Sequence, residues 1–213
     1  MTTILYIITA LALAHIIADY YRVWQASYLL KPATTMSIIF LAQYLTWPAF
    51  DMFTALVIFA LVFSLLGDIF LMLRSDRFLA GLISFFIAHV LYISAFLYAA
   101  PLTIHLGLLI GLMLVGSGYL YVVLPKAGQL QIPVVAYGLV LQLMVLSAGS
   151  FAMAEGHSSS QYLCLIGALY FIFSDSVLGF SRFVKAWPIS HSIVLGSYYV
   201  AQTLLVLGLL SPR

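Results

Sequence analysis

Charged residues are scarce in this sequence. Only 8 Lys and Arg and 6 Asp and Glu occur among 213 residues, while 65% of the residues are hydrophobic and the mean hydropathy is +1.17. Soluble domains carry about 25% charged residues, so this composition excludes a soluble globular enzyme and indicates a membrane protein. The net charge of +2 is too small and too dispersed for a nucleic-acid surface.

Cysteine pairs and a secretion signal are also lacking. The single cysteine, Cys164, excludes an intramolecular disulfide and leaves the redox compartment undetermined. No basic residue precedes the first apolar run, and no clear cleavage site of small residues follows it. We therefore expect this run to be a helix of the mature protein.

Long apolar runs fill the rest of the chain. A membrane-spanning helix needs about 20 mostly apolar residues, and eight such segments fit the sequence. They are predicted at 4–21, 32–50, 53–73, 79–99, 102–124, 132–154, 161–181 and 189–210. The fold class predicted is all-α, a polytopic bundle of eight transmembrane helices that forms a single domain over residues 1–213.

The prolines support these boundaries. Pro32, Pro101, Pro125 and Pro188 fall at the predicted ends of segments, and Pro133 falls in a first turn. Proline removes no needed hydrogen bond at such places.

The basic residues predict the orientation of the bundle. Seven of the eight fall in connections on one face: Arg22, Lys31, Arg74, Arg77, Lys126, Arg182 and Lys185. Only Arg213 falls on the other face. The positive-inside rule places the seven in the cytoplasm, so both termini are expected to be extracytoplasmic. We expect an integral, multi-pass protein of the bacterial inner (cell) membrane.

Two predicted helices share a short pattern around an aspartate. Asp68 and Asp175 each follow a small residue, precede a leucine by three positions, and are followed by Arg-Phe at the exit of the segment. Segments four apart run in the same direction, so a four-plus-four parallel repeat is one interpretation. The aspartates precede Arg74 and Arg182 by six and seven residues, which predicts a similar depth for both carboxyls.

These buried acids are costly. A charged group at the membrane centre costs about 2.5–3.5 kcal/mol on insertion scales, so a functional role is favoured for Asp68 and Asp175. The structural alternative is an acid that pairs with Lys31 or an arginine to hold the bundle together. Lys31 is interpreted either as a snorkelling interfacial lysine or as a phosphate-binding residue.

Further polar residues in the apolar segments are candidates for substrate binding, each with a purely structural alternative. His191, Tyr198 and Gln202 form one stripe by their spacing of seven and four. The complete set of predicted binding residues is Lys31, His89, Tyr92, Tyr137, His191, Tyr198 and Gln202. Asp19 is interpreted as an interfacial ion pair with Arg22, or as part of a polar cavity with His15.

The sequence gives little support to a metal-dependent mechanism or to a serine nucleophile. His15 and Asp19 have ligand spacing, but no His-x-x-x-His motif and no cysteine pair accompanies them. The Gly-x-Ser-x-Gly motif of serine hydrolases is absent as well. We expect no metal and no cofactor.

Several short motifs together resemble the YhhN-type lysoplasmalogenase family. They are Leu29-Leu-Lys-Pro32, Leu65-Leu-Gly-Asp-Ile-Phe-Leu71, Gly81-Leu-Ile-Ser-Phe-Phe-Ile-Ala-His89 with Tyr92, Phe173-Ser-Asp-Ser176 and Tyr198-Tyr-Val-Ala-Gln202. The resemblance implies an eight-helix membrane hydrolase that cleaves the vinyl ether of a lysoplasmalogen. The products would be a fatty aldehyde and glycerophosphoethanolamine or glycerophosphocholine, and the family's two aspartates would be Asp68 and Asp175.

That chemistry needs a well-placed acid. Protonation of the vinyl ether carbon remote from oxygen gives an oxocarbenium ion, which water attacks. Two carboxyls close together in a low-dielectric site can share one proton at neutral pH, so we hypothesise that Asp68 and Asp175 form such a catalytic pair. The expected partner is a lysophospholipid substrate within the bilayer. A lysolipid transporter or flippase that uses the carboxylates for proton coupling is the alternative.

Overall fold

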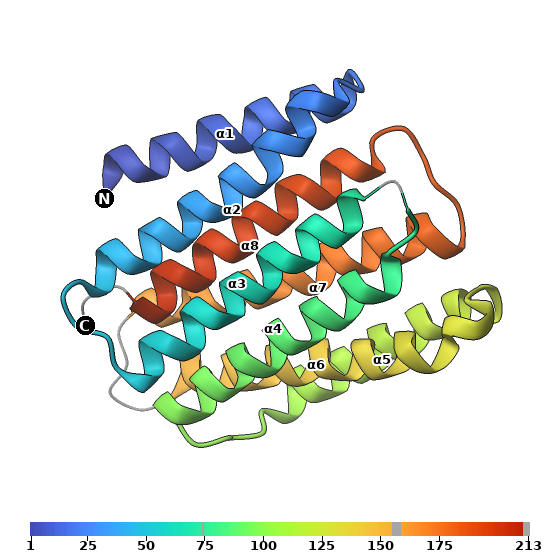
Figure 1. Ribbon diagram of the computed structural model, residues 1–213. Helices are drawn as coiled ribbons and strands as arrows, with labels where there is room; N and C mark the ends of the chain where they lie inside the picture. The colour runs from blue at the N-terminus through green and yellow to red at the C-terminus, as the bar shows by residue number, and fades with distance from the viewer. Residues whose placement is uncertain (74, 155–158, 211–213) are drawn as a thin grey trace.

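In the part of the chain that the structure describes, apolar segments joined by short connections fold into eight α-helices (Figure 1). The computed structural model describes residues 1–73, 75–154 and 159–210. The helices are α1 (Thr2–Tyr20), α2 (Trp24–Thr46), α3 (Met52–Met72), α4 (Phe78–Ala99), α5 (Leu106–Val123), α6 (Gln131–Met153), α7 (Tyr162–Phe183) and α8 (Ser190–Leu210). The predicted all-α bundle is confirmed. Arg74, Glu155 and Arg213 lie outside the described residues.

Seven of the eight helices are long and apolar enough to cross a membrane, within the part of the chain that is described. The helix that does not meet this criterion is α2. It is 23 residues long, so length is not the reason. Its polar side chains, among them Lys31, Thr34 and Thr35, lower its hydropathy, and these three are buried inside the bundle rather than exposed to lipid.

Pro32 corrects the predicted start of the second helix. The sequence-based boundary treated this proline as a helix start, but α2 begins at Trp24 and Pro32 lies within it. Membrane helices tolerate such prolines where the surrounding protein can satisfy the backbone carbonyl that loses its helical donor. Lys31 is consequently an interior residue of the helix.

The fifth helix also begins later than predicted, at Leu106 rather than at residue 102. Ser150 of α6 explains the difference. Its hydroxyl accepts a hydrogen bond from the backbone N–H of Thr103 and donates one to the Thr103 carbonyl. Because both backbone groups of Thr103 are satisfied from outside, this residue needs no helical hydrogen bonds.

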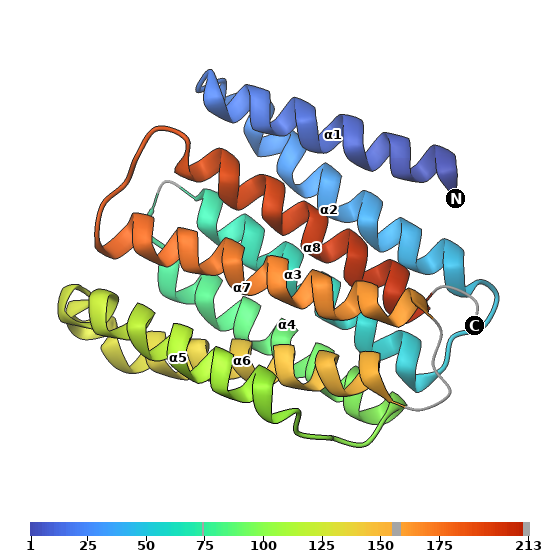
Figure 2. The ribbon, with the colours of Figure 1, turned by 180° about the vertical axis from the view of Figure 1, so that it is seen from behind.

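The helices surround α8, which contacts α1, α2, α3 and α7. On the other side α6 contacts α4, α5 and α7. The outer helices α1 and α5 bury few residues, and both views show them at opposite margins of the bundle (Figures 1 and 2). The second helix of each half packs on the fourth helix of the other half, since α2 contacts α8 and α6 contacts α4. This exchange is the arrangement that a four-plus-four repeat would produce.

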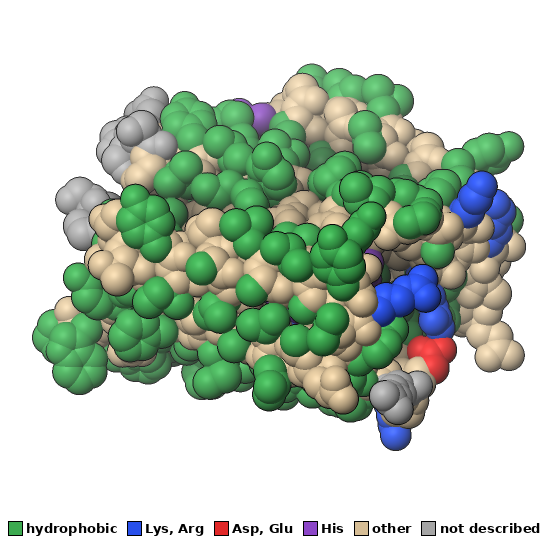
Figure 3. Space-filling model, turned by 90° about the horizontal axis from the view of Figure 1, so that it is seen from above, with side chains coloured by type: hydrophobic (Ala, Val, Ile, Leu, Met, Phe, Trp, Pro, Cys, Tyr) green, Lys and Arg blue, Asp and Glu red, His purple; other side chains and the backbone are tan. Residues whose placement is uncertain are grey.

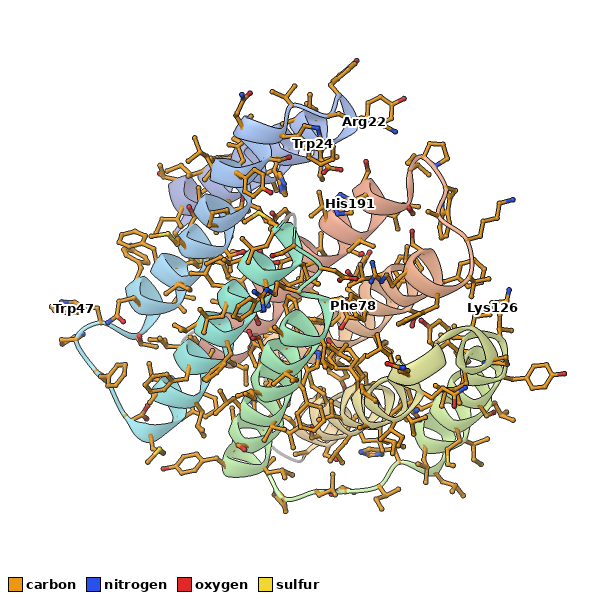
Figure 4. The ribbon with its side chains drawn as sticks, turned by 45° about the vertical axis from the view of Figure 1, so that its right-hand side comes forward. Arg22, Trp24, Trp47, Phe78, Lys126 and His191 are labelled. Carbon is orange, nitrogen blue, oxygen red and sulfur yellow. The ribbon has the colours of Figure 1, made fainter. Side chains whose placement is uncertain are left out.

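The start of α1 and the last turn of α8 lie at the same end of the bundle (Figure 1). Arg22 and Lys126 lie at the other end, away from Trp47 (Figure 4). Figure 3 shows basic side chains gathered at one end of the molecule, while the other side chains on the face in view are mainly hydrophobic. The basic side chains that the structure describes agree with the predicted separation of charge, whereas Arg74 and Arg213 lie outside the described residues. The cytoplasmic location of the basic end remains a prediction.

Candidate active site

Asp68 lies near the end of α3, and its partners come from α2 and α8. Its Oδ1 lies 3.2 Å from Nζ of Lys31 on α2. Its Oδ2 accepts hydrogen bonds of 2.8 Å from the hydroxyls of Thr35 and Tyr198. Both members of the ion pair are buried. The carboxyl of Asp68 is thus fully engaged by protein groups.

A polar chain extends from Asp68 into the bundle. The Gln202 side-chain amide donates to the Tyr198 hydroxyl over 3.4 Å, and the Tyr92 hydroxyl donates to Oε1 of Gln202 over 2.6 Å. Three predicted site residues, Tyr92, Tyr198 and Gln202, are therefore brought together on the Asp68 side of the bundle.

Asp175 has a different set of partners. The Tyr137 hydroxyl of α6 donates to its Oδ2 over 2.5 Å, and Nε2 of His89 on α4 lies 3.5 Å from the same oxygen. His89 Nε2 also lies 3.0 Å from the Tyr137 hydroxyl. Since the one hydroxyl proton of Tyr137 goes to Asp175, His89 must be the donor in that contact. The structure thus brings His89 and Tyr137 together at Asp175.

The two carboxyls are not in contact with each other. Neither a hydrogen bond nor an ion pair joins Asp68 to Asp175, both of which are described residues. An aromatic ring lies between their partners: the Phe171 ring is 4.6 Å from the His89 ring and 5.6 Å from the Tyr198 ring, by centroids. The hypothesis of a closely coupled aspartate pair finds no support in these contacts.

The two aspartate sites are nevertheless built alike. Asp68 of α3 is held by residues of α2 and α8, and Asp175 of α7 is held by residues of α6 and α4. In each half of the chain, the third helix carries the acid, the second helix of the same half supplies one partner, and the fourth helix of the other half supplies another. The repeat interpretation accounts for this correspondence.

An apolar cavity of about 510 Å³ lies between α4, α5, α6 and α7. Most of its lining is hydrocarbon, from residues such as Leu82, Leu112 and Leu141. Asp175 and Tyr137 belong to the lining, and the Asp175 side chain is 10% exposed. Asp68 does not line this cavity. An apolar space with a carboxyl in its wall suits a lipid tail next to an acid.

A second cavity of about 380 Å³ opens at the basic end of the bundle. Its charged or titratable lining residues are Lys31, Asp76, Arg77, Arg182 and His191. The two cavities share Leu71, Phe78 and Leu178 in their walls, so they adjoin. Phe78 and His191 mark this region in Figure 4.

His191 lies apart from the other residues of the predicted stripe. While Tyr198 and Gln202 are buried, the His191 side chain is 54% exposed, and its Nδ1 lies 2.6 Å from Oδ2 of Asp19 on α1. The predicted ion pair of Asp19 with Arg22 is therefore wrong, because His191 takes its place. His15 lies instead 2.7 Å from the Tyr199 hydroxyl.

The sequence-based prediction missed Thr35, Asp76, Arg77 and Arg182 as possible site residues. Thr35 follows Lys31 by four residues, a spacing that places both on one helix face, so a signal for it existed. The other three lie in or beside connections, and the sequence gives no sign that these connections fold over one cavity. Across 1–73, 75–154 and 159–210, no group of three His, Cys, Asp or Glu side chains is arranged to hold a metal ion.

Several known proteins are similar to this chain in sequence. Human Lysoplasmalogenase TMEM86B is 36% identical over 159 residues, which cover 74% of this chain and 65% of the relative. Human Lysoplasmalogenase TMEM86A is 31% identical over 158 residues, covering 72% and 64%. The Escherichia coli protein named Uncharacterized membrane protein YhhN is 26% identical over 188 residues, covering 87% and 88%.

The chain therefore spans just under two thirds of the length of the lysoplasmalogenases that it matches. No solved structure matches it. The sequence pattern of the YhhN family matches residues 26–209, from the first turn of α2 to the last turn of α8, and so includes both aspartates and both cavities. On this evidence the chain belongs to the YhhN family.

Proposed function

We propose that this protein hydrolyses the vinyl ether bond of lysoplasmalogens in the membrane, releasing a fatty aldehyde and glycerophosphoethanolamine or glycerophosphocholine. The observation that carries the proposal is the Asp175 carboxyl in the wall of an apolar cavity of about 510 Å³. The relatives named lysoplasmalogenase support the choice of reaction. The basic end of the bundle would lie in the cytoplasm of a bacterial cell.

Asp175 is the acid in this proposal. Its Oδ2 accepts from Tyr137, which leaves Oδ1 to carry the proton and deliver it to the vinyl carbon remote from oxygen. The carboxylate that remains is stabilised by the Tyr137 hydroxyl and faces the new oxocarbenium ion. His89 fixes the orientation of Tyr137.

Water completes the reaction. It adds to the oxocarbenium carbon and returns a proton to Asp175, so one carboxyl serves as acid and then as base, as in retaining glycosidases. The hemiacetal that forms breaks into the aldehyde and the glycerol hydroxyl. One water is consumed for each vinyl ether cleaved, and the enzyme is returned to its starting protonation state.

Asp68 acts through other residues in this scheme. It holds the Lys31 ammonium, which lines the polar cavity, and it holds the Tyr198 hydroxyl at the end of the chain through Gln202 to Tyr92. Its proposed role is therefore to position Lys31 in the wall of the polar cavity and to anchor the buried chain of Tyr198, Gln202 and Tyr92, which lines neither cavity. His191 would act from the polar cavity.

An assay with matched lipids tests the proposal. Purified protein in detergent is incubated with 1-alkenyl, 1-alkyl and 1-acyl lysophospholipids of the same chain length and headgroup. Aldehyde is expected from the alkenyl lipid only. If none of the three lipids releases aldehyde, the hydrolase proposal is overturned. The transport alternative would then be examined in proteoliposomes. Fatty acid release from the acyl lipid would contradict the proposed vinyl ether chemistry.

A further inference from the structure

The polar cavity at the basic end contains charges of both signs. Arg77, Arg182 and Lys31 contribute positive charge, and Asp76 contributes negative charge. Arg182 and Asp76 form an ion pair, and this hydrogen bond lowers the pKa of Asp76, so its carboxyl is ionised at neutral pH. Lys31 is already neutralised by buried Asp68. The guanidinium of Arg77 has no bonded partner among the described side chains and is free for a ligand.

The position of Arg182 connects this charge to the apolar cavity. Its guanidinium lies 5.1 Å from the centroid of the Phe78 ring, and Phe78 lines both cavities. Arg182 follows Asp175 by seven residues on α7, which corresponds to about 10 Å along the helix axis. A lysophospholipid has about this separation between its vinyl ether and its phosphate, so one molecule can reach both residues.

We propose that the polar cavity binds a phosphoethanolamine headgroup, with the phosphate between Arg77 and Arg182 and the ammonium at Asp76. This inference rests on the proposed function, because it places the vinyl ether of the same molecule beside Asp175. Arginine is suited to phosphate because its planar guanidinium can donate two parallel hydrogen bonds. When Arg182 turns to the phosphate, Asp76 becomes available to the ammonium.

The lining favours ethanolamine over choline. A primary ammonium can donate hydrogen bonds to the Asp76 carboxylate, whereas a quaternary ammonium has no proton to donate and is typically bound by aromatic faces. Phe70 and Phe78 are the aromatic residues of this cavity. Two phenylalanine rings do not surround a quaternary ammonium, so the described lining offers no aromatic cage.

The experiment measures binding without turnover. The probes are 1-O-alkyl lysophospholipids, whose saturated ether lacks the vinyl group, with ethanolamine, with choline, or with a bare phosphate as the headgroup. Dissociation constants are measured in detergent for the wild type and for Arg182→Gln, Asp76→Asn and Lys185→Gln. Lys185 is exposed and lies three residues beyond Arg182, outside the cavity lining, so its variant controls for general loss of positive charge.

Each variant has its own expected pattern. Arg182→Gln should weaken binding of all three lipids about tenfold, since each loses a charge-assisted hydrogen bond to phosphate. Asp76→Asn should weaken binding of the ethanolamine lipid but not of the bare-phosphate lipid. Lys185→Gln should leave all three unchanged, and the wild type should bind ethanolamine more tightly than choline.

Two outcomes would overturn the headgroup site. One is an equal effect of Arg182→Gln and Lys185→Gln, and the other is an equal effect of Asp76→Asn on the ethanolamine and bare-phosphate lipids. The side chains of Arg182 and Asp76 are 43% and 64% exposed, so their replacement should leave the fold intact, as size-exclusion chromatography can check. Since no aldehyde is measured, failure of the hydrolase proposal would be seen separately.

Discussion

The hydroxyl of Tyr137 donates a 2.5 Å hydrogen bond to Oδ2 of Asp175, joining α6 to α7 at the wall of the apolar cavity. His89, from α4, contacts both groups. Three helices thus fix the direction of one carboxyl. The carboxyl keeps one oxygen for the substrate, and this is the feature that a general acid requires.

Replacement of Tyr137 by Phe tests that orientation. The variant keeps the ring but removes the hydroxyl that holds Asp175 and stabilises its carboxylate. We expect kcat for aldehyde release to fall about 10- to 100-fold, the range of a lost interaction with a charged group, with little change in KM. Tyr121→Phe is the matched control, because Tyr121 is 84% exposed on α5. Equal kcat values for the two variants would exclude Tyr137 from the mechanism.

Replacement of each aspartate by Asn separates the two acids. Asp175→Asn should abolish aldehyde release and still bind the 1-O-alkyl lysophospholipid, because the amide fills the same space but cannot deliver the proton. Asp68→Asn should also lose most turnover, and in addition weaken lipid binding, because Lys31 and Tyr198 lose their anchor. Turnover at the wild-type rate in either variant would show that the replaced aspartate is not required for catalysis.

Local patterns were enough to predict the helices and many of the polar residues, because length and hydropathy decide which segments can cross a membrane. The same reasoning failed at Pro32. Because proline lacks an N–H, Pro32 was expected at the start of a helix, but α2 begins at Trp24 and continues through it. Membrane helices tolerate interior prolines through their packing in the bundle, and the sequence does not reveal that packing.

The partners of the aspartates were harder to predict. The spacing of Asp68 and Asp175 suggested equal depth, but whether they touch depends on how the helices rotate and pack. The Phe171 ring lies between their partners, and nothing in the sequence around Phe171 distinguishes it from a lipid-facing phenylalanine. The ion pair of Asp76 with Arg182 could not be predicted from their charges either, because 106 residues separate them in the sequence.

Lys31 and Asp68 form a buried ion pair, so the effects of replacing them on the stability of the fold should be strongly coupled. Lys31→Met leaves the buried Asp68 carboxylate without its cation, and removal of one partner of a buried pair typically costs about 3–5 kcal/mol. Asp68→Asn leaves the ammonium unpaired at a similar cost. The double variant Lys31→Met/Asp68→Asn removes both charges, so we expect it to be more stable than either single variant. The measurement is the unfolding midpoint in detergent.

Additive losses in the double variant would contradict this expectation, because independent effects imply that the two charges do not compensate each other. Lys126→Met provides the control. Lys126 is exposed in the short connection between α5 and α6 and has no ion pair in the described part of the molecule. Its replacement should leave the midpoint unchanged.

Close packing of α7 against α8 predicts that Gly208 cannot be enlarged. A Cβ at this position would lie 2.8 Å from the backbone nitrogen of Cys164 and 3.1 Å from the carbonyl oxygen of Ser160. Backbone atoms cannot move aside as a flexible side chain can, so Gly208→Ala should destabilise the fold by about 1–3 kcal/mol, as overpacking does. A lower thermal midpoint in detergent would show this effect.

Gly118 on α5 is the matched control, because a Cβ there would meet nothing within 4 Å. Alanine has the higher helix propensity, so Gly118→Ala should leave the midpoint unchanged or raise it, by at most about 1 kcal/mol of stability. Opposite responses of the two glycines would identify backbone proximity as the cause. A similar fall for both would instead mean that glycine itself is needed in these helices, and the close approach of α7 and α8 would not explain the loss.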